Sequence, residues 1–226
     1  MARFGVSCGA PCAAAIWILC ALEARAGEAW VSAGAGGGAE AFHSYGGITW
    51  APVGSLDTEG LRARAWGKAL KLDQRGEVGG TGAEVELGWQ FIGPAWRFAA
   101  FAGAAWRDEP GTNKQLGASL VAEGSYEITS RWRFIADGKY TIGLDEAWAQ
   151  VRPEFKLTEA LYVGVSAAGN KGPNYKLFQS AVSLGGFSYA MPWMGDVYVS
   201  VEAGAQYNVT TKNIAPFGAL HLGFAY

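Results

Sequence analysis

The stretch that decides the fold is IAPFGALHLGFAY, residues 214–226. Side chains of an extended strand point alternately to opposite faces, so this stretch has one apolar face and one mixed face. The apolar face carries Pro216, Gly218, Leu220, Leu222, Phe224 and Tyr226. An apolar strand at the end of a soluble protein leaves an unpaired edge, whereas closure of a barrel removes that edge. The stretch therefore predicts the closing strand of a membrane-spanning β-barrel.

The same alternation recurs in segments of roughly 10–15 residues separated by turn residues, which is typical of membrane barrels. The clearest segment is residues 82–92. Its apolar side chains are those of Val85, Leu87, Trp89 and Phe91, and they alternate with Glu84, Glu86, Gly88 and Gln90. A two-residue turn at Gly93-Pro94 predicts that Phe91 pairs with Trp96 and Gln90 with Arg97 on the returning strand.

Counting these segments predicts an all-β, closed antiparallel barrel of about twelve strands, or ten if residues 29–36 are only a lead-in. Short turns at Gly93-Pro94, Thr129 and Thr158 are assigned to the periplasmic side. Longer, polar external loops are expected at residues 73–80, 107–112, 170–174 and 208–213. Aromatic side chains are expected in two girdles, with Phe42, Trp106, Tyr140, Tyr175 and Tyr207 in the external one.

Residues 1–26 read as a secretory signal peptide that precedes a single barrel domain, residues 27–226. Arg3 gives a positive start, residues 10–22 are apolar, and Ala24-Arg25-Ala26 offers a small-x-small cleavage site. The apolar run is shorter than the about 20 residues of a membrane-spanning helix, which argues against the alternative of an N-terminal anchor. All three cysteines lie in this segment, so disulfides and Cys-based metal or redox sites are not expected elsewhere.

Composition excludes some classes of protein. The formal net charge is −2, and no basic run occurs, so nucleic acid is not an expected partner. No apolar run of about 20 residues follows the signal peptide, so no transmembrane helix is expected. Near-neutral mean hydropathy fits both a soluble protein and a porin-like barrel, and the alternation described above favours the barrel.

Little in the sequence indicates catalysis, a metal or a cofactor. The two histidines, His43 and His221, lack the spacing of metal ligands. His43 and Ser44 could form half of a Ser/His pair, but adjacent strand residues point to opposite faces. The glycine cluster at residues 34–38 lacks the helix that a phosphate-binding loop requires. We therefore expect no catalytic, metal or cofactor-binding residues.

Charged side chains gather on the inward parity of the predicted strands. The residues expected to line the lumen are Trp66, Glu84, Glu86, Arg97, Glu123, Arg133, Asp137, Lys139, Trp148, Arg152, Glu154, Tyr198 and Glu202. One interpretation is a set of Arg/Glu pairs that holds a narrow interior together, and pairing is the usual state of buried charges. The other is a polar track for a solute, in which Trp66, Trp148 and Tyr198 stack on sugar rings.

Several short motifs resemble the cellulose biosynthesis protein BcsS family. They are YGGITWAPVGSLD at 45–57, EGLRARA at 59–65, LGWQF at 87–91, the strand at 98–106, VRPE at 151–154 and AGN at 168–170. The family's usual Gly-Pro-Glu is Arg152-Pro153-Glu154 here. The resemblance covers most of residues 27–226. It implies a non-enzymatic outer-membrane barrel of Gram-negative cells that works in cellulose, or exopolysaccharide, biosynthesis or secretion.

The partners that the resemblance implies are outer-membrane lipid and either cellulose or other components of its synthesis and secretion. Three alternatives stay open from the residues themselves. They are a small general porin, a barrel enzyme that modifies lipids or acyl groups, and a soluble periplasmic barrel.

Overall fold

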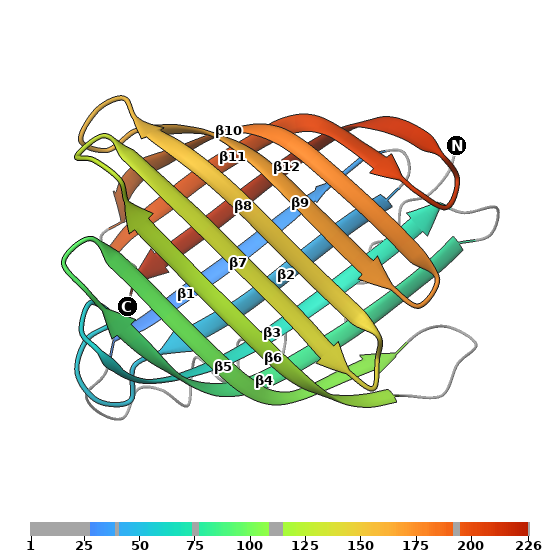
Figure 1. The fold of residues 1–226 in the computed structure, drawn as a ribbon, viewed down its shortest axis with the longest axis horizontal. Helices are drawn as coiled ribbons and strands as arrows, with labels where there is room; N and C mark the ends of the chain where they lie inside the picture. Colours follow the sequence, from blue (N-terminus) through green and yellow to red (C-terminus); the bar gives the residue numbers. More distant parts are fainter. Residues whose placement is uncertain (1–27, 39–40, 74–76, 109–114, 192–194, 226) are drawn as a thin grey trace.

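The computed structural model describes residues 28–38, 41–73, 77–108, 115–191 and 195–225, which form twelve antiparallel strands (Figure 1). In the described chain, no helix has the length and apolar character to cross a membrane. The strands are β1 (Ala29–Gly37), β2 (Ala41–Trp50), β3 (Gly60–Asp73), β4 (Glu77–Ile92), β5 (Trp96–Asp108), β6 (Gln115–Glu127), β7 (Trp132–Ile142), β8 (Glu146–Lys156), β9 (Tyr162–Gly172), β10 (Tyr175–Met191), β11 (Gly195–Asn208) and β12 (Asn213–Ala225).

Each strand pairs with its neighbours in the sequence, and β12 pairs with β1 to close the barrel. Trp30 of β1 lies opposite Ala225, and Gly37 lies opposite Gly218. Closure leaves no sheet edge along the wall, which is the condition for a barrel in lipid. The prediction that the final strand closes against the first is confirmed, and so is the count of twelve. Tyr226 itself, and the predicted signal peptide, lie outside the described residues.

The wall is apolar on its outer surface and polar inside, as the alternation predicts. On β4, Val85 is 64% exposed, whereas the inward Glu86 is 1% exposed. Leu87 and Trp89 share the outer face with Val85, and Gln90 is buried with Glu86. The side-chain period of two therefore sorts these residues between the outside and the lumen, and the described part of the chain places no second sheet or helix against the wall.

The hairpin between β4 and β5 differs from the prediction by two residues. Phe91 lies opposite Phe98 and Ile92 opposite Arg97, so the pairings expected from a two-residue turn are wrong. Four residues, Gly93 to Trp96, connect the last paired residues Ile92 and Arg97, and the amide of Gly93 donates to the carbonyl of Trp96 at 2.8 Å. A shift of two residues preserves the side-chain parity, so every face assignment on these strands still holds.

The expected contrast between short periplasmic turns and long external loops is not observed. Strands β3 and β4 run through most of residues 73–80, and only residues 173–174 separate β9 from β10. The longest connection, residues 51–59, lies instead at the end of the barrel where β1 begins and β12 ends, here named the termini end. Tyr175 is also not part of an outer aromatic girdle, because it is buried in the interior beside Ala41 and Leu177.

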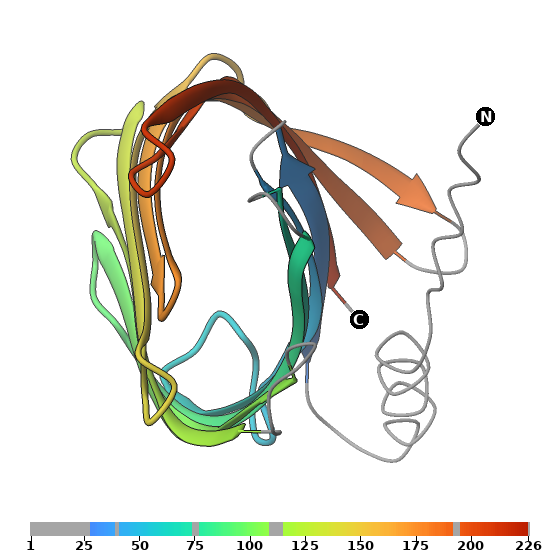
Figure 2. The same cartoon turned by 90° about the vertical axis from the view of Figure 1, so that its right-hand side faces the viewer.

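Seen along its axis, the barrel has an oval cross-section (Figure 2). The segment between β2 and β3 folds inward across the interior, and the hairpin of β10 and β11 leaves the wall and extends away from it (Figure 2). Both features interrupt the regular alternation of wall residues. They determine how the interior is filled and which surfaces stay uncovered.

Candidate functional site

The interior of the barrel is the candidate site, and a buried arginine occupies its middle. The side chain of Arg64 on β3 is only 7% exposed, and its Nε lies 2.6 Å from Oε2 of Glu86 on the neighbouring β4. It also pairs with Glu123 on β6, two strands beyond β4. Its guanidinium stacks over the rings of Trp66 and Phe101, at 5.1 and 4.8 Å from their centroids. Arg64 therefore joins separate parts of the wall across the interior.

A second cluster of ion pairs lies farther from the termini end than Arg64 does. Lys68 of β3 bonds Glu146 of β8 at 2.5 Å and lies 3.4 Å from Glu84 of β4. Glu84 also pairs with Lys139 of β7, and Arg107 of β5 lies 3.1 Å from Glu146. Strands β3 and β8 are five positions apart in the ring of twelve. These contacts therefore span the lumen, since only one of the four ion pairs, Lys68 with Glu84, joins neighbouring strands.

A third cluster lines the wall formed by β7 to β12. Arg152 lies 2.8 Å from Glu154 on its own strand and 3.4 Å from Glu202 on β11. Glu154 also pairs with Arg133, whose guanidinium lies 4.3 Å from the ring centroid of Tyr162. The result is a continuous chain of alternating charges around this side of the interior.

A histidine links this third cluster to the strands where the barrel closes. The imidazole Nδ1 of His221 on β12 lies 2.6 Å from the hydroxyl of Tyr45 on β2. Its Nε2 lies 3.9 Å from Glu202. The ring of Tyr45 also packs against Trp66, with centroids 5.5 Å apart. Trp66 also contacts the guanidinium of Arg64, so the ring of Trp66 connects the third cluster to Arg64.

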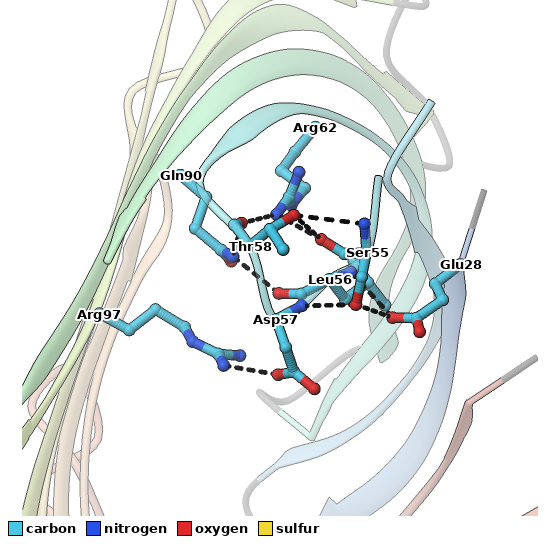
Figure 3. Close-up of polar contacts among 8 residues, drawn as sticks. All are labelled: Glu28, Ser55, Leu56, Asp57, Thr58, Arg62, Gln90 and Arg97. Carbon is cyan, nitrogen blue, oxygen red and sulfur yellow. Dashed lines mark hydrogen bonds and ion pairs between the residues drawn. The ribbon is translucent and has the colours of Figure 1, made fainter. Parts of the chain in front are cut away.

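The termini end is filled in a different way, by the segment 51–59 between β2 and β3, here named the inward loop (Figure 3). Its backbone carbonyls are the main acceptors. The guanidinium of Arg62 donates to the carbonyls of Ser55 at 3.0 Å and Thr58. The side-chain amide of Gln90 donates to the carbonyls of Leu56 at 2.7 Å and Thr58 at 3.0 Å. These two wall residues therefore hold the loop through its backbone, and no carboxylate of the loop takes part in their bonds to it.

Two carboxylates complete the contacts of the inward loop (Figure 3). Glu28, just before β1, accepts from the Ser55 hydroxyl at 2.6 Å and from the Leu56 amide at 2.9 Å. Asp57 of the loop pairs with Arg97 of β5 at 2.7 Å, and both side chains are exposed. Gly54 has φ of +80°, a conformation that favours glycine and lets the chain reverse inside the barrel.

The residues expected to line the lumen fall into these clusters, except for four. Trp148 faces inward opposite Lys139, and Asp137 lies directly opposite Glu123. Tyr198 belongs to none of the three clusters, and its ring packs on that of Trp30, with centroids 5.4 Å apart. Arg97 sits at the termini end and contacts the inward loop. Whether any of these residues contacts a solute stays a prediction.

Sequence reasoning missed several residues that turn out to be central. Arg64 and Lys68 have the inward parity on β3, and this signal alone could have placed them with the lumen charges. Glu146 stands at the first position of β8, where parity is hard to read. No periodic signal marks the inward loop, since a loop has no side-chain period.

The arrangement offers paired charges rather than an assembled catalytic group. Among the described residues, no three His, Cys, Asp or Glu side chains come together as a metal site. His43 stacks on Phe217, with ring centroids 6.2 Å apart. His43 and Ser44 are adjacent residues of β2, so their side chains point to opposite faces of the wall.

Solved structures with a similar fold are barrels. The KdgM porin has a TM-score of 0.54 and 10% sequence identity, over 87% of this chain and 99% of that one. The β domain of the Bordetella autotransporter BrkA has a TM-score of 0.56 and 12% identity, over 89% and 99%. At this identity the likeness concerns the fold alone. No curated protein matches the sequence.

A family model described as cellulose biosynthesis protein BcsS matches residues 33–222. The matched region runs from β1 to β12, so it includes all three ion-pair clusters and the inward loop. The match confirms the resemblance that the short sequence motifs indicate. The chain therefore belongs to the cellulose biosynthesis protein BcsS family.

Proposed function

We propose that this protein is a non-enzymatic component of cellulose, or exopolysaccharide, biosynthesis or secretion, located in the outer membrane of a Gram-negative cell. The family match over residues 33–222 carries the link to cellulose biosynthesis. The apolar outer surface of a closed twelve-strand barrel supports a location in lipid. The termini end faces the periplasm, and residues 1–26 act as a cleaved signal peptide.

The pairing of the lumen charges supports a role other than that of a wide channel. Lys68 and Arg64 each bond carboxylates on strands that are not adjacent to theirs. A solute that passes through the middle would have to separate these pairs, and this leaves the buried Arg64 and Glu146 side chains without those partners, which is unfavourable. The protein then serves as a partner or regulator of the secretion apparatus, with cellulose or another component at one of its ends.

Deletion of the gene, with measurement of secreted cellulose, tests this function. We expect reduced cellulose output and recovery when the wild-type gene is restored on a plasmid. Unchanged output would contradict the role in cellulose production and leave the barrel fold untouched. Fractionation of the same cells tests the location, because recovery in the soluble periplasm would favour the alternative of a soluble barrel.

A small general porin is the second candidate, and the likeness of fold to the KdgM porin favours it. Planar-bilayer recordings of the purified protein separate the two functions. Steady conductance without preference for polysaccharide would support the porin, whereas a closed lumen gives little current. The third candidate, a barrel enzyme acting on lipids or acyl groups, requires hydrolase activity that is lost in the His43→Ala variant. Absence of measurable activity would remove it.

A further inference from the structure

The ends of β10 and β11 form a ribbon that separates from the neighbouring strand β9 at the termini end. Strand β9 pairs with β10 only as far as Gly185, which lies opposite Tyr162. Residues 187–191 of β10 pair with residues 195–199 of β11, and this pairing is here named the ribbon. Residues 197–199 of β11 also pair with residues 222–224 of β12, so the open edge of the ribbon is that of β10. It extends away from the oval of the barrel in Figure 2. Beyond Gly185, the edge of β10 pairs with no further strand among the described residues, so this side of the ribbon is open to another surface.

The two faces of the ribbon differ in chemistry. One face pairs Phe187 with Val199 and Tyr189 with Val197, so all four side chains are large and mainly apolar. The other face carries the pairs Ser188 with Tyr198 and Ala190 with Asp196. On the apolar face, Tyr189 is 68% exposed and Phe187 is 47% exposed. Asp196 is the single charged residue in the sequence 186–200, and it belongs to the other face.

A bulge makes the apolar face continuous with the outer surface of the barrel. Before the bulge, even-numbered residues of β10 such as Val182 point outward. The register shifts between Gly185 and Phe187, so odd-numbered residues take the outward face beyond it. Without this extra residue, Phe187 and Tyr189 would turn to the inner side. Gly186 is required here, since its φ is +92° and a Cβ would collide with the carbonyl oxygen of Ala160.

We propose that the apolar face of the ribbon lies on the periplasmic leaflet of the outer membrane, with Phe187 and Tyr189 in the boundary between headgroups and acyl chains. This inference rests on the proposed membrane location of the barrel. A ribbon that bends away from the barrel axis turns its outer face toward the membrane surface and its mixed face toward water. Aromatic rings with one polar edge favour that boundary, and amphipathic elements without charge on the buried face bind it.

Single cysteines labelled with an environment-sensitive bimane test the inference. Every variant has Cys8, Cys12 and Cys20 replaced by serine, so that the introduced thiol is unique. Tyr189→Cys and Phe187→Cys report on the apolar face, and Ser188→Cys reports on the mixed face. Val182→Cys gives the reference in lipid, and Glu59→Cys, in the exposed inward loop, gives the reference in water. Each variant is reconstituted in phosphatidylethanolamine/phosphatidylglycerol vesicles, and folding is checked by its heat-dependent migration on gels.

Quenching by headgroup-level nitroxide lipid and by aqueous iodide distinguishes the outcomes. The inference expects labels at 187 and 189 to lose fluorescence to nitroxide as the label at 182 does, while the labels at 188 and 59 respond to iodide. Iodide quenching of 187 and 189, with 182 quenched by lipid, would overturn the inference alone. Shielding of 187 and 189 from both quenchers would also overturn it, because a second protein copy then covers the face. If 182 is not quenched by lipid, the proposed membrane location itself fails.

Discussion

The middle of the lumen and its termini end are filled by different kinds of contact. In the middle, charged side chains from separate strands bond one another, as Arg64 does with Glu86 and Glu123. At the termini end, Arg62 and Gln90 donate mostly to backbone carbonyls of the inward loop. The first arrangement is set by the positions of the wall strands, and opening it requires the separation of charge pairs that include buried side chains. The second holds a loop, which can leave without any change in strand register.

The largest effect is expected from Arg64→Met in the middle of the lumen. The substitution leaves the Glu86 carboxylate, whose side chain is 0% exposed, without its cation. Breaking a buried ion pair on one side costs roughly 3–5 kcal/mol of unfolding free energy. Urea unfolding in detergent, followed by tryptophan fluorescence and gel migration, measures this loss.

A matched double variant distinguishes the loss of a pair from the loss of packing. Arg64→Met combined with Glu86→Leu removes the buried pair and leaves Glu123, which is 39% exposed and open to water. Replacing a whole buried pair by apolar residues is often close to neutral. We therefore expect the double variant to recover much of the stability lost by the single one. If both variants lose the same stability, the packing of the Arg64 side chain on Trp66 and Phe101 explains its role instead.

The contrast also shows how much of the molecule could be predicted from the sequence. Strand number, closure and the facing of residues such as Val85 and Glu86 follow from a period of two, because lipid and lumen impose opposite preferences on alternate positions. The sequence predicts the position of the hairpin at Gly93 but not its pairing, since the turn has four residues instead of two, and this shift of two residues preserves the side-chain parity.

The candidate site was predicted only in part. Parity indicates that Arg152 and Glu202 face inward, but not that they bond each other, because pairing across a barrel depends on its tilt and cross-section. The inward loop could not be predicted, since its bonds run from Arg62 and Gln90 to carbonyl groups that every residue type carries. The bulge at Gly186 could not be predicted either, because a single glycine is the one feature of the sequence that marks it.

At the termini end, Gln90→Leu is expected to have a smaller effect on stability and a larger one on the loop. The side-chain amide of Gln90 bonds the carbonyls of Leu56 and Thr58. Thr58 keeps its bond from Arg62, so the substitution removes the donor of Leu56, and an acceptor left without a donor costs about 1–3 kcal/mol when it stays buried. The Glu59 side chain is already exposed, and loosening of the loop should let its backbone fit more readily into a glutamate-specific protease. Faster cleavage after Glu59, together with higher bilayer conductance, is the expected result, and Gln179→Leu on β10 serves as the control. Unchanged cleavage would mean that the other contacts suffice to hold the loop.

Asp57→Asn tests the exposed contact of the same loop. The pair of Asp57 with Arg97 is open to solvent on both sides, and such pairs contribute about 0.2–1 kcal/mol. We expect a small decrease in the urea midpoint that disappears at high salt, because ions screen exposed charges. A loss as large as that of Arg64→Met would remove the distinction between the two ends of the lumen.

The smallest effect is expected outside the lumen, at Lys156→Gln. Lys156 bonds Glu159 at 2.9 Å in the turn after β8, and the Glu159 side chain is 99% exposed. The hydrogen bond from Lys156 lowers the pKa of Glu159, so any stability it provides is present above the pKa of the unfolded chain and is lost as the pH falls through about 4. Water competes fully for both groups, and we expect the same urea midpoint for variant and wild type on either side of that pH. Equal midpoints here, beside a large loss for Arg64→Met, would attribute the strength of the lumen contacts to burial rather than to charge alone.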